Sequence, residues 1–179
     1  MLKHILIRLS SLLVLFALAA CGGGGGSGSS AAALTNANGS YTNATLKIAL
    51  VGTLPSGTSI AGVNFTLFFL PELKPAMTNG AVAAGVVTPS GTFATGIQLE
   101  PVYTAPATAT SYGNLLITLA DTSQAGVTQV GEIGEITLQL PSHAAPTSNS
   151  YMLSTNGVID LAGNPITTLR AVVSEVTLQ

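Results

Sequence analysis

Alternating apolar and polar positions predict β-strands in the main part of the chain. In residues 45–51, Leu46, Ile48 and Leu50 fall on one face of an extended segment. Residues 60–70, IAGVNFTLFFL, repeat the two-residue period and contain three of the five phenylalanines. This period is typical of a strand that buries one of its faces. We therefore predict two half-buried strands here, of which 60–70 is the central strand of the fold.

Shorter segments of the same kind continue to the end of the chain, separated by turns rich in proline, glycine and asparagine. The further predicted strands are 80–87, a weak strand in 93–103 that is interrupted at Pro101, 115–120, 132–140, 150–154, 157–161 and 171–178. About nine short strands favour an all-β sandwich over a barrel with a ligand cavity.

The N-terminus has the pattern of an export signal. Lys3 and Arg8 precede an apolar run that is too short to span the ~30 Å hydrocarbon core of a bilayer as a helix. The run ends in Leu-Ala-Ala-Cys, which resembles the lipobox of bacterial lipoproteins. The resemblance implies cleavage between Ala20 and Cys21, a signal peptide at 1–20, and a lipid-modified cysteine that holds the protein on a membrane. Gly22, in place of aspartate, is compatible with the outer membrane or cell surface of a Gram-negative bacterium.

A linker follows the cysteine. Residues 22–30 read GGGGGSGSS and small or polar residues continue to residue 39, so 21–40 is predicted to be a flexible tether. Residues 41–179 remain for one domain, which is long enough to fold around its own core.

Composition and charge narrow the class of partners. Hydrophobic residues make up 47% of the chain and charged residues only 7%. Few long charged side chains are present to cover helices, which agrees with an all-β domain. Without residues 1–20, three basic and seven acidic side chains remain. This balance argues against nucleic acid as a partner, and against membrane contact other than through the lipid anchor.

The order of the predicted strands resembles the cohesin family. The segments that carry the resemblance are IAGVNFTLFFLP, VVTPSG, YGNLLITLADTSQAG, GEIGEITLQLP and VVSEVTLQ. Cohesins are jelly-roll sandwiches of about nine strands and are related in fold to carbohydrate-binding modules. The resemblance implies a non-catalytic module that binds a dockerin-like or other envelope protein. The alternative is a module that binds polysaccharide.

Reactive side chains are few, and each has a structural interpretation. His143 is the only histidine after the leader and cannot form a catalytic triad or metal site alone. Glu132 and Glu135 are three residues apart in a predicted strand, so they are expected on opposite faces. They then cannot work as the paired carboxylates of a glycosidase. We expect no enzyme and no cofactor.

Two residue pairs could form weaker binding sites, one for Ca²⁺ and one for a sugar ring. Asp160 and Asn164 lie in DLAGNP and could provide oxygen ligands for Ca²⁺, although an Asx-type turn explains these two residues better. Tyr103 and Tyr112 flank one loop and could form a small sugar-stacking platform, although packing at the core or rim explains them better.

Overall fold

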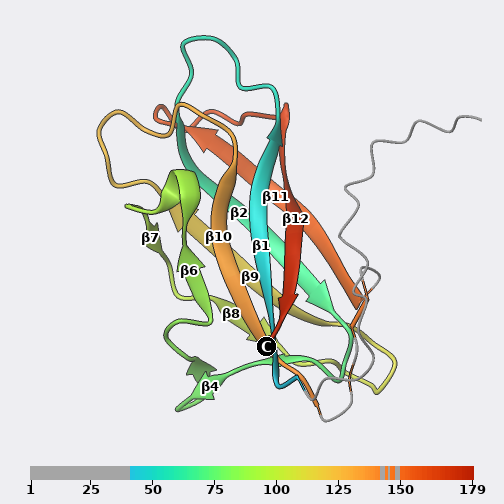
Figure 1. Ribbon diagram of the computed structural model, residues 1–179. Helices are drawn as coiled ribbons and strands as arrows, with labels where there is room; N and C mark the ends of the chain where they lie inside the picture. The colour runs from blue at the N-terminus through green and yellow to red at the C-terminus, as the bar shows by residue number, and fades with distance from the viewer. Residues whose placement is uncertain (1–40, 142–143, 145, 148–149) are drawn as a thin grey trace, which may run out of the picture.

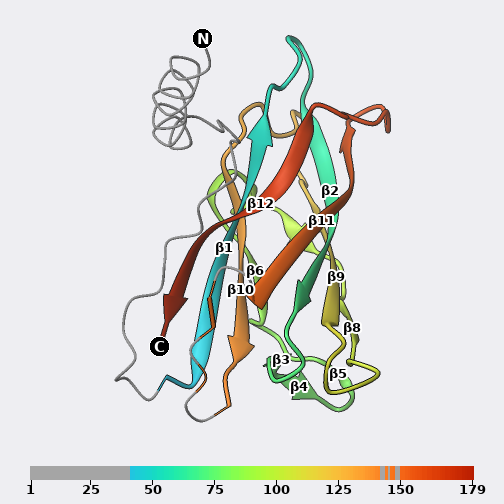
Figure 2. The ribbon, with the colours of Figure 1, turned by 90° about the vertical axis from the view of Figure 1, so that its right-hand side faces the viewer.

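The computed structural model describes residues 41–141, 144, 146–147 and 150–179. They form two antiparallel sheets that pack face to face as a sandwich, seen from the front in Figure 1 and from the side in Figure 2. Within these residues there is no α-helix, and the one helical element is a 3-10 turn at Gly91–Phe93. The all-β sandwich predicted from the strand pattern is confirmed.

The first sheet, which we call the β1 sheet, has the order β12–β1–β10–β3, and β6 also pairs with β10. Its strands are β1 (Asn43–Gly52), β3 (Lys74–Pro75), β6 (Val87–Pro89), β10 (Glu132–Gln139) and β12 (Leu169–Leu178). The last strand therefore returns to lie beside the first, and the backbone of Gln179 accepts hydrogen bonds from the N–H groups of Thr42 and Asn43.

The second sheet, the β2 sheet, has the order β11–β2–β9–β7, and β8 also pairs with β9. Its strands are β2 (Ile60–Phe69), β7 (Ile97–Gln98), β8 (Val102–Thr104), β9 (Gly113–Ala120) and β11 (Tyr151–Asp160). A separate hairpin, β4 (Met77–Thr78) with β5 (Ala81–Val82), lies at the end of the sandwich where the C-terminus is found (Figures 1 and 2).

The core fills the space between the two sheets with the inward positions of each strand. The alternation predicted for residues 45–51 and 60–70 is confirmed, because Leu46, Ile48, Phe65 and Leu67 are each at most 1% exposed. The segment 60–70 forms β2, which lies inside its sheet between β11 and β9. Burial of large apolar side chains from both layers is the main force that holds such a sandwich together.

Four of the strand predictions need correction. Segments 150–154 and 157–161 form one strand, β11, in which Asn156 is an extra residue at a bulge. Segment 80–87 forms only β5 and the start of β6, because Gly85 turns the chain with a φ of +84°. Segment 93–103 begins within the 3-10 turn and continues in the short strands β7 and β8.

The prediction that Glu132 and Glu135 lie on opposite faces is wrong. A bulge shifts the register of β10 against β1 between Ile48 and Ala49, so that Glu132 pairs with Ala49 while Glu135 pairs with Lys47. Residues three apart in a regular strand point to opposite faces, but the extra residue of the bulge brings these two side chains to the same face. Both glutamates consequently lie on the outer face of the β1 sheet.

Candidate functional site

The outer face of the β2 sheet is a continuous surface of uncharged side chains, which we call the neutral face. Its positions alternate with the buried ones along β2 and β9, and strand pairing fixes which residues lie next to one another. From the end far from the C-terminus, its four rows across the sheet are Ile159, Gly62, Ala120 and Ile97; Gly157 with the bulged Asn156, Asn64, Thr118 and Leu99; Ser154, Thr66, Leu116 and Val102; Met152, Phe68, Asn114 and Thr104.

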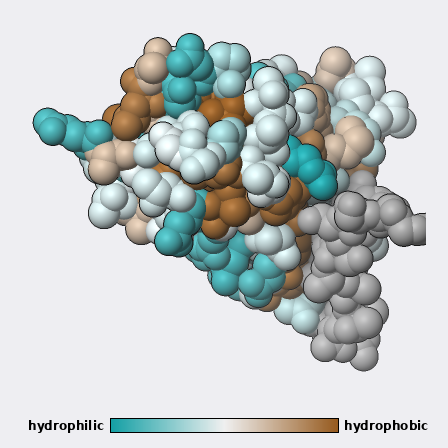
Figure 3. All heavy atoms as spheres, turned by 90° about the horizontal axis from the view of Figure 1, so that it is seen from above, coloured by the Kyte–Doolittle hydropathy of each residue, from teal (hydrophilic) through white to brown (hydrophobic). Residues whose placement is uncertain are grey.

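Exposed apolar side chains are concentrated on this face. Six of the ten large hydrophobic residues that are exposed in the described part of the chain belong to it: Ile97, Leu99, Val102, Leu116, Met152 and Ile159. Leu161, which is 52% exposed, follows directly after β11. From the end of the sandwich opposite the C-terminus, apolar surface is visible between hydrophilic side chains (Figure 3). Single exposed apolar residues are common on proteins, whereas a gathered group indicates a contact surface.

An amide and hydroxyl network crosses the middle of the neutral face. Asn64 Nδ2 donates to Thr118 Oγ1 at 2.6 Å, and Asn156 Nδ2 donates to Asn64 Oδ1 at 2.7 Å and to Thr66 Oγ1 at 2.9 Å. The bulge in β11 is what brings Asn156 over its neighbours. Because these polar groups already bind one another, a partner can cover them with a smaller loss of hydrogen bonds to water.

The outer face of the β1 sheet, unlike the neutral face, carries charged side chains. It carries Lys47, Glu132, Glu135, Arg170 and Glu175 on three neighbouring strands. Lys47 Nζ lies 3.1 Å from Glu175 Oε2, and this hydrogen-bonded pair raises the pKa of Lys47, with smaller contributions from Glu132 and Glu135. Such an exposed pair stabilises a fold little, so this face is a solvated charged surface.

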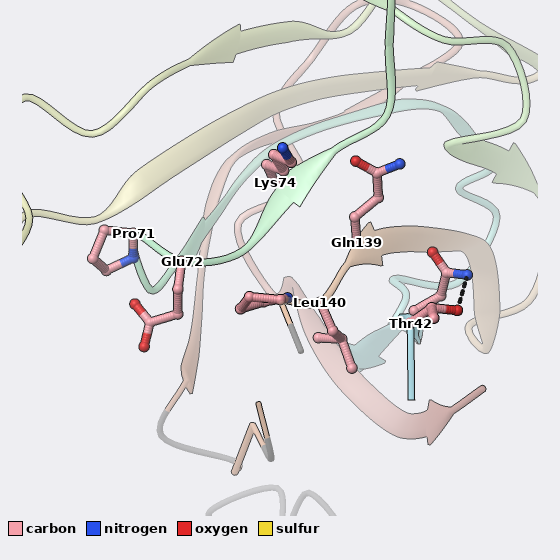
Figure 4. Close-up of a pocket in the computed structure, with 8 residues that line it drawn as sticks. Thr42, Pro71, Glu72, Lys74, Gln139 and Leu140 are labelled. Atoms are coloured by element: carbon pink, nitrogen blue, oxygen red, sulfur yellow. Dashed lines mark hydrogen bonds between the residues drawn. The ribbon is translucent and has the colours of Figure 1, made fainter. Parts of the chain in front are cut away.

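A depression of about 630 Å³ lies at the end of the sandwich where the described chain begins. It is lined by Thr42, Asn43, Pro71, Glu72, Lys74, Gln139, Leu140 and Pro141. Figure 4 shows the side chains of Glu72 and Lys74 pointing in different directions, and the hydrogen bond drawn there joins Asn43 Nδ2 to Thr42 Oγ1. Among these eight described residues there is no nucleophile next to a base and no group of metal ligands.

The structure places Tyr103 against the core and leaves Tyr112 in an exposed loop. Tyr103 pairs with Leu115, which points inward, and its ring stacks on the buried ring of Phe69 at a centroid distance of 6.1 Å. One face of Tyr103 is therefore covered by the core, as packing at the rim predicts. Tyr112 is 39% exposed in the loop before β9.

Asp160 and Asn164 form a tight turn. Asp160 Oδ1 accepts hydrogen bonds from the N–H groups of Ala162 and Asn164, and Oδ2 accepts one from Asn164 Nδ2. The bonds from Asn164 are the main reason that the pKa of Asp160 lies below its usual range. The carboxylate thus stabilises the turn through these hydrogen bonds. In the described ranges no three His, Cys, Asp or Glu side chains gather as metal ligands.

The remaining predicted site residues, Ala20, Cys21 and His143, lie outside the described residues, as do the signal segment 1–20 and the tether up to residue 40. Among the residues that the structure describes, no helix has the length and hydrophobicity needed to cross a bilayer. Comparison with protein-family models, curated proteins and solved structures gave no significant match.

Sequence reasoning missed the neutral face, although a signal for it was present. In the segment 60–70, Asn64 and Thr66 occupy the positions that alternate with the apolar ones, and the outward positions of 115–120 also lack charge. What the sequence does not reveal is which strands are neighbours. Only the pairing of β2 with β9 and β11 shows that these uncharged positions form one surface.

Proposed function

We propose that this chain is a lipid-anchored envelope protein whose sandwich domain binds another protein through the neutral face, without catalysis. The observation that carries the proposal is the absence of charge from all four rows of that face, while five charged side chains lie on the opposite face. The centre of a protein–protein interface is typically depleted of charged residues and rich in apolar ones.

Two further properties support a protein rather than another kind of ligand. Nucleic acid requires clustered Lys and Arg, and no basic residue lies on this face. Sugar rings usually stack on exposed aromatic side chains, and the one aromatic residue in the four rows is the partly buried Phe68. A protein surface with uncharged apolar side chains is the complementary partner.

The size of the face sets the kind of complex that we expect. Four strand positions at ~4.8 Å spacing, and residues 62–68 along β2 at ~3.4 Å each, give an area of about 450 Å². A stable complex usually buries about 800 Å² on each partner. The partner should therefore reach beyond the four rows or bind transiently.

The resemblance to cohesins supports the same function. On this proposal, residues 41–179 are a jelly-roll module of the cohesin type, and the partner is a dockerin-like or other envelope protein. Signal cleavage after Ala20 and lipidation of Cys21 place the protein on the outer membrane or cell surface. As the random coil that their composition predicts, residues 21–40 would span roughly 25 Å, enough to hold the domain clear of the lipid headgroups.

Lipid attachment is tested by growing cells with a labelled palmitate analogue and following the label on the protein. The wild-type chain should carry the label and Cys21→Ala should lose it. An unlabelled wild-type chain would refute the anchor.

Protein binding is tested with the soluble chain, which is residues 21–179 with Cys21→Ser, as bait in the envelope fraction of the same organism. Leu116→Glu places a charge in the third row of the neutral face, and Thr177→Glu places one on the exposed outer side of β12. We expect saturable retention of a protein by the wild type and Thr177→Glu, and loss of it with Leu116→Glu. Retention that is equal for both variants, or no saturable partner, would exclude the proposed surface.

A further inference from the structure

We propose that the depression of about 630 Å³, at the end of the sandwich where the described chain begins, binds a neutral sugar unit such as one residue of a polysaccharide. This site goes beyond the proposed function, because it shares no residue with the neutral face and needs no protein partner. Its volume falls within the ~300–1,000 Å³ that is usual for sites that hold small ligands.

A row of polar side chains across the β1 sheet forms one wall of the depression. Asn43 of β1 pairs with Gln139 of β10, and Gln139 pairs with Lys74 of β3. The adjacent residue in each of these strands is buried, so the three polar side chains lie on the outer side of the sheet. Neighbouring strands are ~4.8 Å apart, which places two amides and an ammonium group at a spacing close to the width of a sugar ring.

The hydrogen-bonding groups of the depression are available to a ligand. Glu72, Lys74 and Gln139 are exposed, and their side chains make no hydrogen bond or ion pair with any other residue that the structure describes. A carboxylate only accepts hydrogen bonds, an ammonium group only donates them, and an amide does both. A sugar hydroxyl also donates and accepts, so each of these three side chains can bind one.

The balance of charge favours a neutral ligand. Glu72 is the one acid and Lys74 the one base among the eight lining residues, and Figure 4 shows their side chains pointing in different directions. A phosphate or carboxylate ligand would be repelled by Glu72, and a cationic ligand would be repelled by Lys74. A neutral polyol avoids both repulsions and still receives hydrogen bonds from the ammonium and donates them to the carboxylate.

Three apolar residues complete the lining, namely Pro71, Leu140 and Pro141. They can pack against the C–H groups of a sugar ring, although aromatic rings, which are the usual partners of sugars, bury more area. Hydrogen bonds to exposed side chains replace hydrogen bonds to water, so their net gain is small. We therefore expect a dissociation constant of about 1 mM or weaker for a single sugar unit.

Two-dimensional NMR of the isotope-labelled soluble chain, residues 21–179 with Cys21→Ser, tests the site. The probes are neutral trisaccharides of glucose, mannose, galactose and N-acetylglucosamine, each at about 10 mM. At least one of them should shift the backbone amide signals of residues 42–43, 72–74 and 139–140 in a saturable way.

Variants of the exposed side chains identify the groups that bind the sugar. Gln139→Ala removes the central amide of the row and should weaken binding about fivefold or more. Glu72→Gln keeps a hydrogen-bond acceptor but removes the charge, so its affinity should stay within about threefold of the wild type. Tyr112→Ala, in the exposed loop before β9, and Leu116→Glu, on the neutral face, should bind as the wild type does.

The other outcomes overturn the proposal. If none of the sugars shifts these signals, the depression is not a sugar site. Shifts around Tyr112 that disappear in Tyr112→Ala would place sugar binding on that loop instead. Equal affinity of Gln139→Ala and the wild type would show that the row does not hold the sugar. Inorganic phosphate or ethanolamine that shifts the same signals at lower concentration than any sugar would show that the ligand is charged.

Discussion

The hydrogen-bonded network of the neutral face can be tested by removing its members singly and together. Asn64 donates to Thr118 at 2.6 Å and accepts from Asn156 at 2.7 Å. Asn64→Ala removes both bonds, and Asn156→Ala removes the second together with the bond to Thr66 at 2.9 Å. The two substitutions share one bond, so their effects on the free energy of unfolding should not add.

The size of the coupling follows from that shared bond. A hydrogen bond in a protein contributes a net ~0.5–1.5 kcal/mol, and Asn156 is exposed, so water replaces part of what is lost. We expect about 1–2 kcal/mol of destabilisation from Asn64→Ala, which loses two bonds. The double variant should be more stable than the sum of the single effects predicts, by about 1 kcal/mol.

Urea unfolding, followed by far-ultraviolet circular dichroism, measures these free energies. With a slope of ~2 kcal/mol per M, 1 kcal/mol moves the midpoint by about 0.5 M. The control cycle combines Asn64→Ala with Thr137→Ala, because Thr137 pairs with Thr45 in the other sheet. That pair should be additive within ~0.5 kcal/mol. If the Asn64–Asn156 cycle is equally additive, the network does not order the neutral face.

Three further predictions test the fold around the face. Gly91→Ala should destabilise by about 1–3 kcal/mol more than Gly57→Ala in the same urea assay. Both glycines have positive φ, but a Cβ at Gly91 would lie 2.3 Å from a backbone oxygen of β10, whereas none lies within 4 Å at Gly57. Phe69→Ala should cost ~3–5 kcal/mol of unfolding free energy, and Phe68→Ala, on the outer side, much less; equal costs would refute the register of β2. Asp160→Asn should reduce stability at neutral pH, and this difference should shrink in thermal melts as the pH falls below ~4, since the lowered pKa of Asp160 in the folded state stabilises the fold only while the carboxylate is ionised.

Long strands with regular alternation could be predicted from the sequence. The segments 45–51, 115–120 and 171–178 lie within strands of the structure, and 60–70 and 132–140 each extend one residue beyond theirs. Over most of each segment apolar side chains recur at alternate positions, and burial of one face decides the conformation over a whole strand. The two-sheet sandwich then follows from the number of strands and the turns between them.

Local backbone events could not be predicted in the same way. The extra residue in β10 moves Glu132 to the face of Glu135, and the extra residue in β11 joins two predicted strands into one. A bulge leaves no composition signal because it depends on the partner strand. The small residues of 80–87 alternate too weakly to distinguish a strand from the turn at Gly85.

The candidate sites also divide into those that the local sequence predicts and those that depend on contacts between distant segments. The turn formed by Asp160 and Asn164 was readable from the order of its residues, because the hydrogen bonds are local. The stacking of Tyr103 on Phe69 joins strands from distant parts of the chain and had no local signal. The neutral face is the extreme case, since it requires four neighbouring strand positions to be known.

Methionine oxidation provides a direct test of docking on the neutral face. After residues 1–20, the chain has two methionines: Met152 in the fourth row of the face, 50% exposed, and Met77 in the β4–β5 hairpin, 43% exposed. Dilute peroxide converts accessible methionine to the sulfoxide, and mass spectrometry follows each residue separately. With the protein recovered by the bait added in excess, oxidation of Met152 should slow severalfold while that of Met77 stays near its rate in the free chain. Equal rates for Met152 with and without the bound protein would show that the partner does not cover the neutral face.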